Sequence, residues 1–324
     1  MPKVSVIVAI YNIEGYLDRC LNSLKEQTFK DFEVLCVDDG SKDGSGKIID
    51  RYAEEDKRFR HLLKENGGLS DARNYGMQHM SGDYIVFIDG DDFVEKDLLE
   101  TVYDRMVSDD LDLCVYDYYQ NFILTGNREV IHIPFDEYKV YSLKNDKELL
   151  CFVSNCAWNK MYRKELFLDN GILYPKGYIQ EDLGTTPKIL YLAERTGFVN
   201  RPLYNYIVDR PNNITTERSE RIYHILDMCS SFIDFYKDKG AFETYYEECK
   251  YLASVNIMQS LKKLPYFTDK RFVDGFLNAA FAFLKKNFPD FPSCKYRLYT
   301  YKEDHIYMNK MLLKTYLAYK RLTK

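Results

Sequence analysis

Short apolar segments alternate with segments of helical periodicity over roughly the first 120 residues of the chain. Residues 4–10 (VSVIVAI) are rich in β-branched side chains and predict a strand, and Leu17, Leu21 and Leu24 follow at the spacing of one helix face. The alternation continues with predicted strands at 32–37, 84–88 and 111–116, and with predicted helices at 48–60, 70–80 and 98–106, the first of which ends in a charged stretch. Strands that alternate with helices of this length pair in parallel, so the pattern predicts an α/β fold with a doubly wound, mainly parallel sheet.

Helical spacing replaces this alternation after about residue 215. Ile222, Leu226, Cys229 and Ile233 recur at intervals of three and four residues, and the apolar residues of 272–283 repeat the pattern. We therefore expect a helical C-terminal subdomain at 215–324.

The composition excludes several classes of protein. A chain of 324 residues with 46% hydrophobic content can bury a large core. Its net charge of −5 provides no basic field for nucleic acid, so no nucleic-acid partner is expected. The eight cysteines form no Cys-x-x-Cys pair, which predicts reduced thiols in a cytoplasmic protein. The apolar run at 4–10 is too short to span a membrane, and we expect no export signal.

One predicted strand ends in three acids within four residues. Asp89 and Asp91 flank Gly90, which lets the backbone fold tightly and direct both carboxylates toward one ligand. Asp39 follows the second predicted strand, and the carboxyl ends of parallel strands meet at one edge of the sheet, where ligands bind. Oxygen ligands of this kind suit Mg²⁺ or Mn²⁺ shared with a phosphate. An acidic turn would explain the same residues without a ligand.

A loop with two glycines precedes the helix predicted at 70–80. The sequence NGGLS at 66–70 opens that helix, and Arg73 lies in its first turn. Backbone amides at a helix N-terminus, together with a cation, can bind a phosphate. Ser70 would equally serve as a helix cap without any ligand. These residues alone leave both interpretations open.

Several motifs follow one another in order along the chain. They are PKVSVIV with Tyr11-Asn12, VDDGS at 37–41, NGGLS at 66–70 with Ala72-Arg73-Asn74, and DGDD at 89–92. Together they resemble the family 2 inverting glycosyltransferases, which have the GT-A fold. Downstream, WNKMYR at 158–163, GILYP at 171–175 and Glu181-Asp182 resemble the acceptor-side half of bacterial capsule and cell-wall members. The resemblance implies a glycosyltransferase domain at 1–214, with a nucleotide-sugar half at about 1–120 and an acceptor half at about 121–214.

The resemblance implies roles in donor binding for four residues of the nucleotide-sugar half. Ala9 and Tyr11 match positions that line the nucleoside, and Asp39 matches the acid that recognises the uracil edge. Arg73 falls where the family places a cation near the diphosphate.

The DGDD motif receives a second set of implied roles. Asp89 matches the ribose-side acid, and Asp91 matches the acid that coordinates Mn²⁺ or Mg²⁺. Gly90 stands between them where serine or alanine is commoner in the family. We expect Asp92 to be a turn or capping residue before a helix that begins near Glu95.

The resemblance also implies the base of the reaction. Asp182 matches the catalytic base, with Glu181 beside it. One departure is the segment RPNNI at 210–214, where many relatives carry an arginine-containing loop ending in Ser-Ile. The role of Arg210 therefore stays open at this point.

These parts suit one reaction. The departing nucleoside diphosphate gains negative charge, which a bound dication stabilises, and a carboxylate on the opposite side of the sugar takes the proton of the attacking hydroxyl. We expect a metal-dependent inverting glycosyltransferase that moves a hexose or N-acetylhexosamine from a UDP-sugar to a hydroxyl of a growing glycan. That acceptor would be a polysaccharide, or a glycan carried on a lipid or a protein.

Two alternatives belong to other classes. A nucleotidyltransferase shares an α/β fold and an acidic metal site, but it would carry a glycine-rich basic loop after the first strand, where this chain has YNIE at 11–14. A non-catalytic UDP-sugar-binding or scaffold subunit of a glycosylation complex would bind the donor without transferring it.

Three further side chains have two interpretations each. Trp158, the only tryptophan, would stack on an acceptor sugar or pack in the core. Lys160 would contact a phosphate or lie exposed on the surface. His224 would be a late metal ligand or a helix-surface residue.

The C-terminal segment is basic. Residues 295–324 carry eight Lys or Arg against two acids, and apolar residues from Met308 to Tyr319 interleave with these bases. This pattern is typical of a basic amphipathic helix in peripheral contact with an anionic membrane, or of a terminal helix docked on its own domain. The 29 tyrosines would also suit a packed helical interface or a homodimer.

Overall fold

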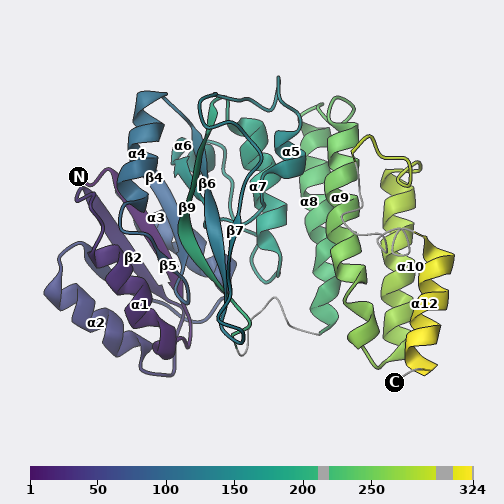
Figure 1. The fold of residues 1–324 in the computed structure, drawn as a ribbon, viewed down its shortest axis with the longest axis horizontal. Coiled ribbons are helices and arrows are strands. Elements are labelled where there is room, and N and C mark those ends of the chain that lie inside the picture. The colour runs from purple at the N-terminus through teal and green to yellow at the C-terminus, as the bar shows by residue number, and fades with distance from the viewer. Residues whose placement is uncertain (211–218, 297–308, 323–324) are drawn as a thin grey trace. The chain divides into compact units, whose positions relative to one another are not determined.

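The computed structural model describes the backbone of residues 1–210, 219–296 and 309–322, and the side chains of these ranges up to Leu317. The chain divides into two compact units, Met1–Asn213 and Ile214–Lys324. The first contains a large sheet with helices, and the second is helical (Figure 1).

A mixed sheet forms the centre of the first unit, with the strand order β3-β2-β1-β4-β8-β6-β9-β5 and with β7 paired to β6. The parallel part consists of β1 (Val4–Ile10), β2 (Phe32–Asp38), β3 (Phe59–Leu63) and β4 (Tyr84–Asp89). The short strand β8 (Lys160–Arg163) runs antiparallel to both of its neighbours, β4 and β6 (Leu113–Phe122), and β9 (Thr196–Val208) pairs in parallel with β6. Two short strands, β5 (Phe93–Val94) and β7 (Arg128–Ile131), add antiparallel pairs to β9 and β6. The predicted α/β fold is confirmed, and the sheet is mixed because β8 enters between two strands of the other direction.

Helices follow the strands at the predicted places. They are α1 (Glu14–Lys25), α2 (Ser45–Glu55), α3 (Leu69–His79) and α4 (Leu98–Ser108). On α1 the apolar stripe is buried at Leu17, Leu21 and Leu24, as its spacing predicts. The helix α3 packs against β1 and β2, whose side chains are buried along nearly their whole length. This packing fixes the carboxyl ends of the strands against the start of α3.

Several element boundaries differ from the prediction, and the strand expected at 111–116 is β6, which ends at Phe122. The charged stretch at 54–60 was expected to end a helix, but α2 ends at Glu55 and β3 begins at Phe59. The helix expected to begin near Glu95 begins at Leu98 instead, with Asp97 at its N-cap, because β5 occupies the preceding residues.

The second half of this unit contains three helices, α5 (Leu149–Phe152), α6 (Glu165–Leu168) and α7 (Glu181–Leu192). The first two pack against α7. Immediately before α7, Gln180 has a φ of 62°, so the chain turns sharply into the helix. This turn places Glu181 and Asp182 in the first turn of α7.

The second unit is built from the 3-10 turns η2 (Glu220–Tyr223) and η3 (Leu264–Tyr266) and from the helices α8 (His224–Asp238), α9 (Tyr246–Leu261), α10 (Lys270–Asn287) and α12 (Lys310–Leu322). The helix α9 packs between α8 and α10, and α12 packs on η3. On α12, Leu313 and Leu317 are buried, whereas Met311 is 74% and Leu312 43% exposed. The expected basic segment is thus partly docked, while its residues 297–308 and the side chains beyond Leu317 lie outside the described residues.

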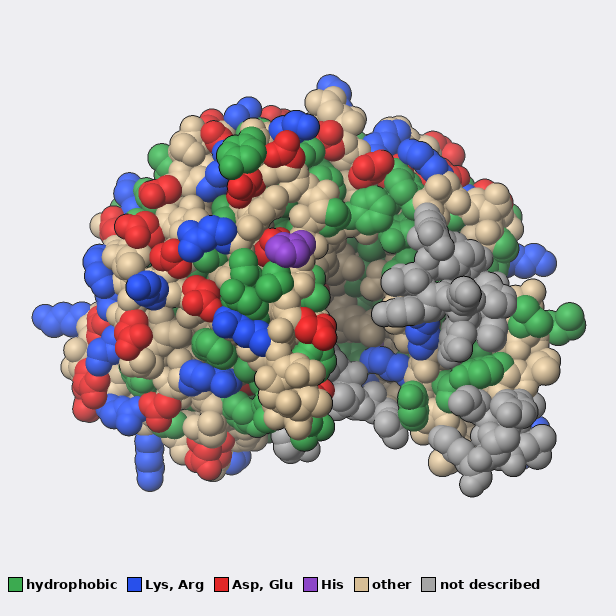
Figure 2. Space-filling view, in the orientation of Figure 1, with side chains coloured by type: hydrophobic (Ala, Val, Ile, Leu, Met, Phe, Trp, Pro, Cys, Tyr) green, Lys and Arg blue, Asp and Glu red, His purple; other side chains and the backbone are tan. Residues whose placement is uncertain are grey.

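Charged side chains of both signs are interspersed over the face of the molecule that Figure 2 shows. This distribution agrees with the modest net charge of −5. Within the ranges that the structure describes, no helix is both long and apolar enough to cross a membrane.

Candidate active site

The parallel strands bring the predicted donor-side residues to one edge of the sheet. In the register of β1, Ala9 lies opposite Val37 of β2 and opposite Asp89 of β4. Tyr11 therefore leaves β1 beside the ends of both neighbouring strands, and its side chain is 48% exposed. This arrangement places an accessible aromatic ring next to the strand-end acids.

Gly90 allows a close approach of backbone segments at this edge. Its N–H donates to the carbonyl of Ala9 at 3.2 Å. A Cβ atom at this position would lie 2.5 Å from Cδ1 of Ile13 and 3.0 Å from the Ala9 carbonyl oxygen. The lack of a side chain at Gly90 therefore allows these segments to pack closely.

Arg73 of α3 joins acids from both halves of the first unit. Its Nη2 donates to Oδ1 of Asp89 at 3.0 Å, and its Nη1 donates to Glu181 Oε1 at 2.9 Å and to Asp182 Oδ1 at 2.7 Å. The guanidinium also lies 5.1 Å from the ring centroid of Tyr174. Arg73 is only 1% exposed and lies between three carboxylates, of which Glu181 is buried and Asp89 and Asp182 are partly exposed.

The neighbouring Asn74 adds a second link between the two halves. Its Nδ2 donates to the carbonyl of Tyr174 at 2.8 Å, and its Oδ1 accepts from the Tyr174 N–H at 2.9 Å. The motif Ala72-Arg73-Asn74 thus joins α3 to the segment that leads into α7. The sequence suggested a phosphate-binding role for Arg73, but did not predict this connection.

Burial dominates the electrostatics of the acid pair. It raises the pKa of Glu181 and of Asp182, because a charged carboxylate is poorly solvated there. Repulsion from Asp182 raises the pKa of Glu181 further, and Asp89 acts in the same direction on Asp182. Arg73 opposes both shifts, and the N–H of Ala157 also donates to Asp182 Oδ2 at 3.1 Å.

Lys160 lies close to this pair and fits neither of its predicted interpretations. It is fully buried, and its Nζ donates to the carbonyls of Ser154 and Cys156 and to Oδ1 of Asn159, each at 2.6 Å. Burial lowers the pKa of this ammonium. Lys160 therefore holds the 154–159 segment in place, and neither a phosphate contact nor an exposed position describes it.

Asp91 pairs with a residue from the far end of the unit. Nε of Arg210 donates to Asp91 Oδ2 in an ion pair, and Nη2 of Arg19 donates to the Asp91 carbonyl at 3.2 Å. Burial and the adjacent Asp89 raise the pKa of Asp91, and Arg210 opposes the shift. Residues 211–214, the rest of the segment singled out in the sequence, lie outside the described residues.

Asp92 is a core residue, which corrects the expectation of a turn or cap. It is fully buried, its Oδ2 accepts from the Tyr204 hydroxyl at 2.7 Å, and its Oδ1 accepts from the Ile207 N–H at 2.7 Å. Burial raises its pKa well above the usual range, and the neighbouring acids add to the shift. Asp92 thus attaches the end of β4 to β9, while Asp97 takes the N-cap position of α4.

The carboxylate of Asp39 accepts four hydrogen bonds from the segment that precedes α3. Oδ1 accepts from Lys64 Nζ at 2.5 Å and from the Gly67 N–H at 2.9 Å, and Oδ2 accepts from Asn66 Nδ2 at 3.0 Å and from the Gly68 N–H at 2.7 Å. Contact of Asp39 with a uracil ring would therefore require one of these donors to give way.

The tryptophan packs inside the unit. Trp158 is 7% exposed, and its ring stacks on Tyr204 and Tyr206 with interplanar angles of 16° and 15°. Tyr118 meets it edge to face. This packing favours the core interpretation over stacking on an acceptor sugar.

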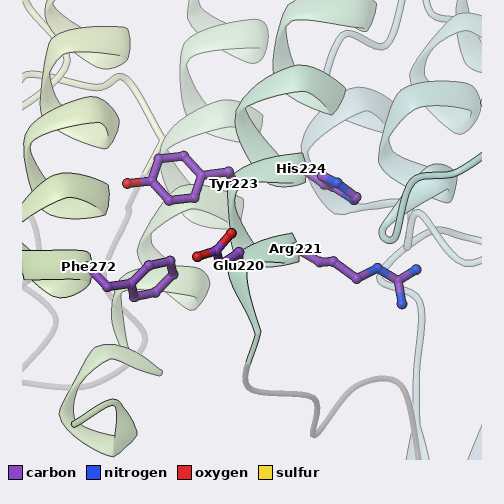
Figure 3. A pocket seen from close by; sticks show the side chains of 5 residues that line it. All are labelled: Glu220, Arg221, Tyr223, His224 and Phe272. Carbon is purple, nitrogen blue, oxygen red and sulfur yellow. The ribbon is translucent and has the colours of Figure 1, made fainter. Parts of the chain in front are cut away.

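His224 lines a hollow in the C-terminal unit, together with Glu220, Arg221, Tyr223 and Phe272. Figure 3 shows Tyr223, Glu220 and Phe272 on one side of η2, while Arg221 and His224 extend to the other. The residues that line this hollow all belong to the second unit, whereas the acid cluster belongs to the first.

The acids at the end of β4 have the chemistry of a shared metal site. Among the residues that the structure describes, no group of three or more His, Cys, Asp or Glu side chains could hold a metal ion by itself. Mg²⁺ typically binds through one or two carboxylates together with phosphate oxygens and water. Asp91 therefore fits a dication that is held jointly with a diphosphate.

Besides the links of Arg73 and Asn74 to the second half of the unit, three partners of the strand-end acids were missed by sequence reasoning. They are Lys64 on Asp39, Tyr204 on Asp92 and Arg210 on Asp91. Of these three residues, only Arg210 stood out in the sequence, because it begins the segment at 210–214 that departs from the family pattern.

Comparison with known proteins relates this chain to glycosyltransferases. The model of the family described as Glycosyl transferase family 2 matches residues 5–171. Glycosyltransferase GlyA of Streptococcus pneumoniae serotype 4 is 37% identical over 237 residues, which cover 69% of this chain and 33% of GlyA. The putative glycosyltransferase EpsH of Bacillus subtilis is 31% identical over 253 residues, which cover 76% of this chain and 73% of EpsH. The match thus spans only a third of the longer relative GlyA.

A solved structure shows the same fold. The crystal structure of S. aureus TarS 1–349 in complex with UDP-GlcNAc matches with a TM-score of 0.73 at 19% identity, over 98% of this chain and 90% of that chain. The mixed sheet with its helices is therefore a fold that this chain shares with TarS.

Proposed function

The chain belongs to glycosyl transferase family 2, and from this membership and the acid cluster we propose that it is a metal-dependent inverting glycosyltransferase that uses a UDP-sugar. The transferred group is a hexose or an N-acetylhexosamine. The acceptor is a hydroxyl of a growing glycan, either a polysaccharide or a glycan carried on a lipid or a protein. The observation that carries this proposal is the link made by Arg73 between Asp89 on the donor side and Asp182 at the start of α7.

The donor lies along the carboxyl ends of β1, β2 and β4. Tyr11 and Ala9 line the nucleoside, and Asp39 lies beside the base. Asp89 takes the ribose side, and Gly90 keeps the backbone close enough for both acids of the motif to face the ligand. Ligands of open α/β sheets bind at this edge, which supports the placement.

The base of the reaction is Asp182. Arg73 and the N–H of Ala157 bind one carboxylate oxygen each, which fixes the orientation of the group. Arg73 also favours the ionised form, which is the form that accepts a proton from the acceptor hydroxyl. Glu181 shares the same guanidinium and supports the position of Asp182.

The metal is Mn²⁺ or Mg²⁺, held by Asp91 together with the diphosphate. When bound, the dication stabilises the negative charge of the departing nucleoside diphosphate. Asp91 offers oxygen ligands of the type that both ions prefer.

The domain boundaries that we propose agree with these positions of the donor and the base. We propose that residues 1–214 form the glycosyltransferase domain, with the nucleotide-sugar half at about 1–120 and the acceptor half at about 121–214, and that 215–324 is a helical subdomain. We also propose that the protein is cytoplasmic and contacts an anionic membrane through α12, where Met311 and Leu312 are exposed. Sedimentation with vesicles of anionic and neutral lipids tests this contact, and light scattering tests whether the protein is a homodimer.

A panel of UDP-sugars with Mn²⁺ tests the function. Free UDP release and thermal shift should single out one donor, with a thermal shift that depends on Mn²⁺. Asp182→Asn should keep the thermal shift and lower the transfer rate by about 10²–10⁴-fold, the usual contribution of a general base. Unchanged transfer by Asp182→Asn would remove the base from its role. A thermal shift without UDP release or transfer to any acceptor would favour a donor-binding subunit.

A further inference from the structure

Each of the three acids at the end of β4 has a different partner. Asp89 pairs with Arg73, Asp92 accepts from Tyr204 and Ile207, and Asp91 pairs with Arg210. We propose that Arg210 is a resident counter-charge of Asp91, which it leaves only when a divalent cation arrives together with a nucleoside diphosphate. The inference rests on the proposed function and adds to it a coupling between the binding of the metal and of the nucleotide, and a residue that sets part of this coupling.

The partners of Asp89 and Asp92 are fixed in the core. Arg73 is held by two further carboxylates and is nearly inaccessible to solvent. Tyr204 lies within β9 and is fully buried, so it moves only with the sheet. Neither residue can leave its acid without breaking other contacts of the fold.

Arg210 lies beyond the end of the sheet, and its guanidinium is also 6.0 Å from the ring centroid of Tyr16. The last pair between β6 and β9 joins Phe122 to Val208, two residues before Arg210. The intervening Asp209 has a φ of 66°, so the chain turns away from the strand direction there. The side chain of Arg210 can therefore leave Asp91 without loss of any strand pairing.

Charge explains why Arg210 and a dication exclude each other. The Asp91 side chain is 15% and the Arg210 side chain 16% exposed, so the pair is largely shielded from water and a second cation at the same carboxylate would be strongly repelled. The part of the chain that the structure describes offers no alternative group of three metal-binding side chains. A dication alone would thus gain one carboxylate and break an ion pair, whereas diphosphate oxygens add the missing ligands.

Binding of the metal and of the nucleotide should therefore be coupled, and Arg210 should set part of the coupling. Removal of Arg210 leaves Asp91 available in the protein without nucleotide. We expect Arg210→Gln to raise the affinity for Mn²⁺ alone by about tenfold, within the usual range of coupling between two ligands. The affinity for Mn²⁺ in the presence of UDP should change less.

Arg19 provides a matched control. Its Nη2 donates to the backbone carbonyl of Asp91 at 3.2 Å, and its guanidinium lies 4.5 Å from the ring centroid of Phe93. Arg19→Gln removes the same charge beside the same residue without breaking a bond to the carboxylate. Any effect of long-range charge should appear in both variants, and only Arg210→Gln should show the effect of the ion pair.

The experiment measures free Mn²⁺ by electron paramagnetic resonance, with and without UDP, for the wild type, Arg210→Gln, Arg19→Gln and Asp91→Asn. We expect weak binding of Mn²⁺ alone to the wild type, tighter binding with UDP, and loss of both in Asp91→Asn. Equal shifts in Arg210→Gln and Arg19→Gln, or none in either, would overturn the inference. If Arg210→Gln does not fold, Arg210→Met, which also removes the charge, should raise the Mn²⁺ affinity above that of Arg19→Gln, and failure to do so would equally overturn the inference.

The same titration separates this inference from the function on which it rests. If the wild type binds UDP with Mn²⁺ but Arg210→Gln leaves the coupling unchanged, only the role of Arg210 is lost. If the wild type binds no UDP in the presence of Mn²⁺, the proposed function fails as well.

Discussion

At the scale of single residues, Arg73 neutralises more buried charge than any other side chain of the candidate site. Its guanidinium binds Asp89, Glu181 and Asp182, and its removal would leave all three carboxylates without this partner. We expect Arg73→Gln to lower the free energy of unfolding by about 3–5 kcal/mol, the usual cost of breaking a buried ion pair. Urea denaturation at constant pH measures the change.

A surface arginine serves as the control for this prediction. Arg201 pairs with Asp97, and their side chains are 53% and 29% exposed. Water screens such a pair, so Arg201→Gln should change the free energy of unfolding by less than about 1 kcal/mol. Equal losses in the two variants would contradict a special role for Arg73.

Glu181 should make stability depend on pH. Burial and Asp182 raise its pKa in the folded protein above the ordinary value of 4.5, so the folded state binds the proton more tightly than the unfolded chain. Glu181 therefore contributes its full stabilisation at a pH below the ordinary pKa. This stabilisation is lost as the pH rises from the ordinary pKa through the raised pKa of the folded protein. Between these two pKa values the loss is about 1.4 kcal/mol per pH unit. The difference in unfolding free energy between wild type and Glu181→Gln, from pH 4 to pH 8, measures it. A difference that is constant with pH would show that the pKa of Glu181 is not raised.

Some of these residue positions could be predicted from the sequence and others could not. The ends of β1, β2 and β4 meet because parallel strands align, and this rule placed Asp39, Asp89 and Asp91 at one edge. The pairing of Arg73 with Glu181 spans 108 residues of sequence, and no local pattern encodes a contact of that separation. The burial of Asp92 was hidden for the same reason, since its partners lie on β9.

At the scale of elements, the junction after β4 depends on the absence of a side chain at Gly90. An added methyl group would contact Ile13 and the Ala9 carbonyl. We expect Gly90→Ala to cost about 1–3 kcal/mol of stability, as overpacking usually does. Ile13→Val removes the Cδ1 atom that the new methyl group meets, so the cost of Gly90→Ala should be smaller in the Ile13→Val background.

A second glycine provides the control. Gly15 lies in α1, and a Cβ added there meets no atom within 4 Å. Gly15→Ala should therefore be neutral or stabilising by up to about 1 kcal/mol, because alanine favours helix. Thermal unfolding of Gly90→Ala, of Gly15→Ala and of Gly90→Ala in the Ile13→Val background measures these differences. A Gly90→Ala protein as stable as the wild type would refute the packing argument.

Local patterns predicted elements well where one face or both faces are apolar. The β-branched runs of β1 and β4 and the stripe of α1 were placed correctly because burial selects these patterns. The strand β3 (FRHLL) was missed because Arg60 and His61 interrupt its apolar residues and because it pairs on one side only, with β2. The helix α9 showed weak periodicity because it is buried between α8 and α10 and lacks a single polar face.

At the scale of the whole molecule, the chain consists of two compact units, Met1–Asn213 and Ile214–Lys324. The residues proposed to bind UDP and the dication all belong to the first unit. A ligand stabilises the part that it binds, by about 2.7 kcal/mol at a concentration of 100 times its Kd. For a unit of this size that corresponds to a rise in Tm of about 2–4 °C per kcal/mol.

We therefore expect calorimetry to show two transitions, of which UDP with Mn²⁺ raises only one. Gly90→Ala should lower the Tm of that same transition, because Gly90 also belongs to the first unit. The variant thus identifies the transition of the first unit without any ligand. Asp91→Asn should abolish the rise without merging the transitions, since the acid that holds the dication is then lost. A single transition that shifts as a whole would mean that the two units unfold together, and a rise confined to the transition that Gly90→Ala leaves unchanged would place the nucleotide outside the acid cluster.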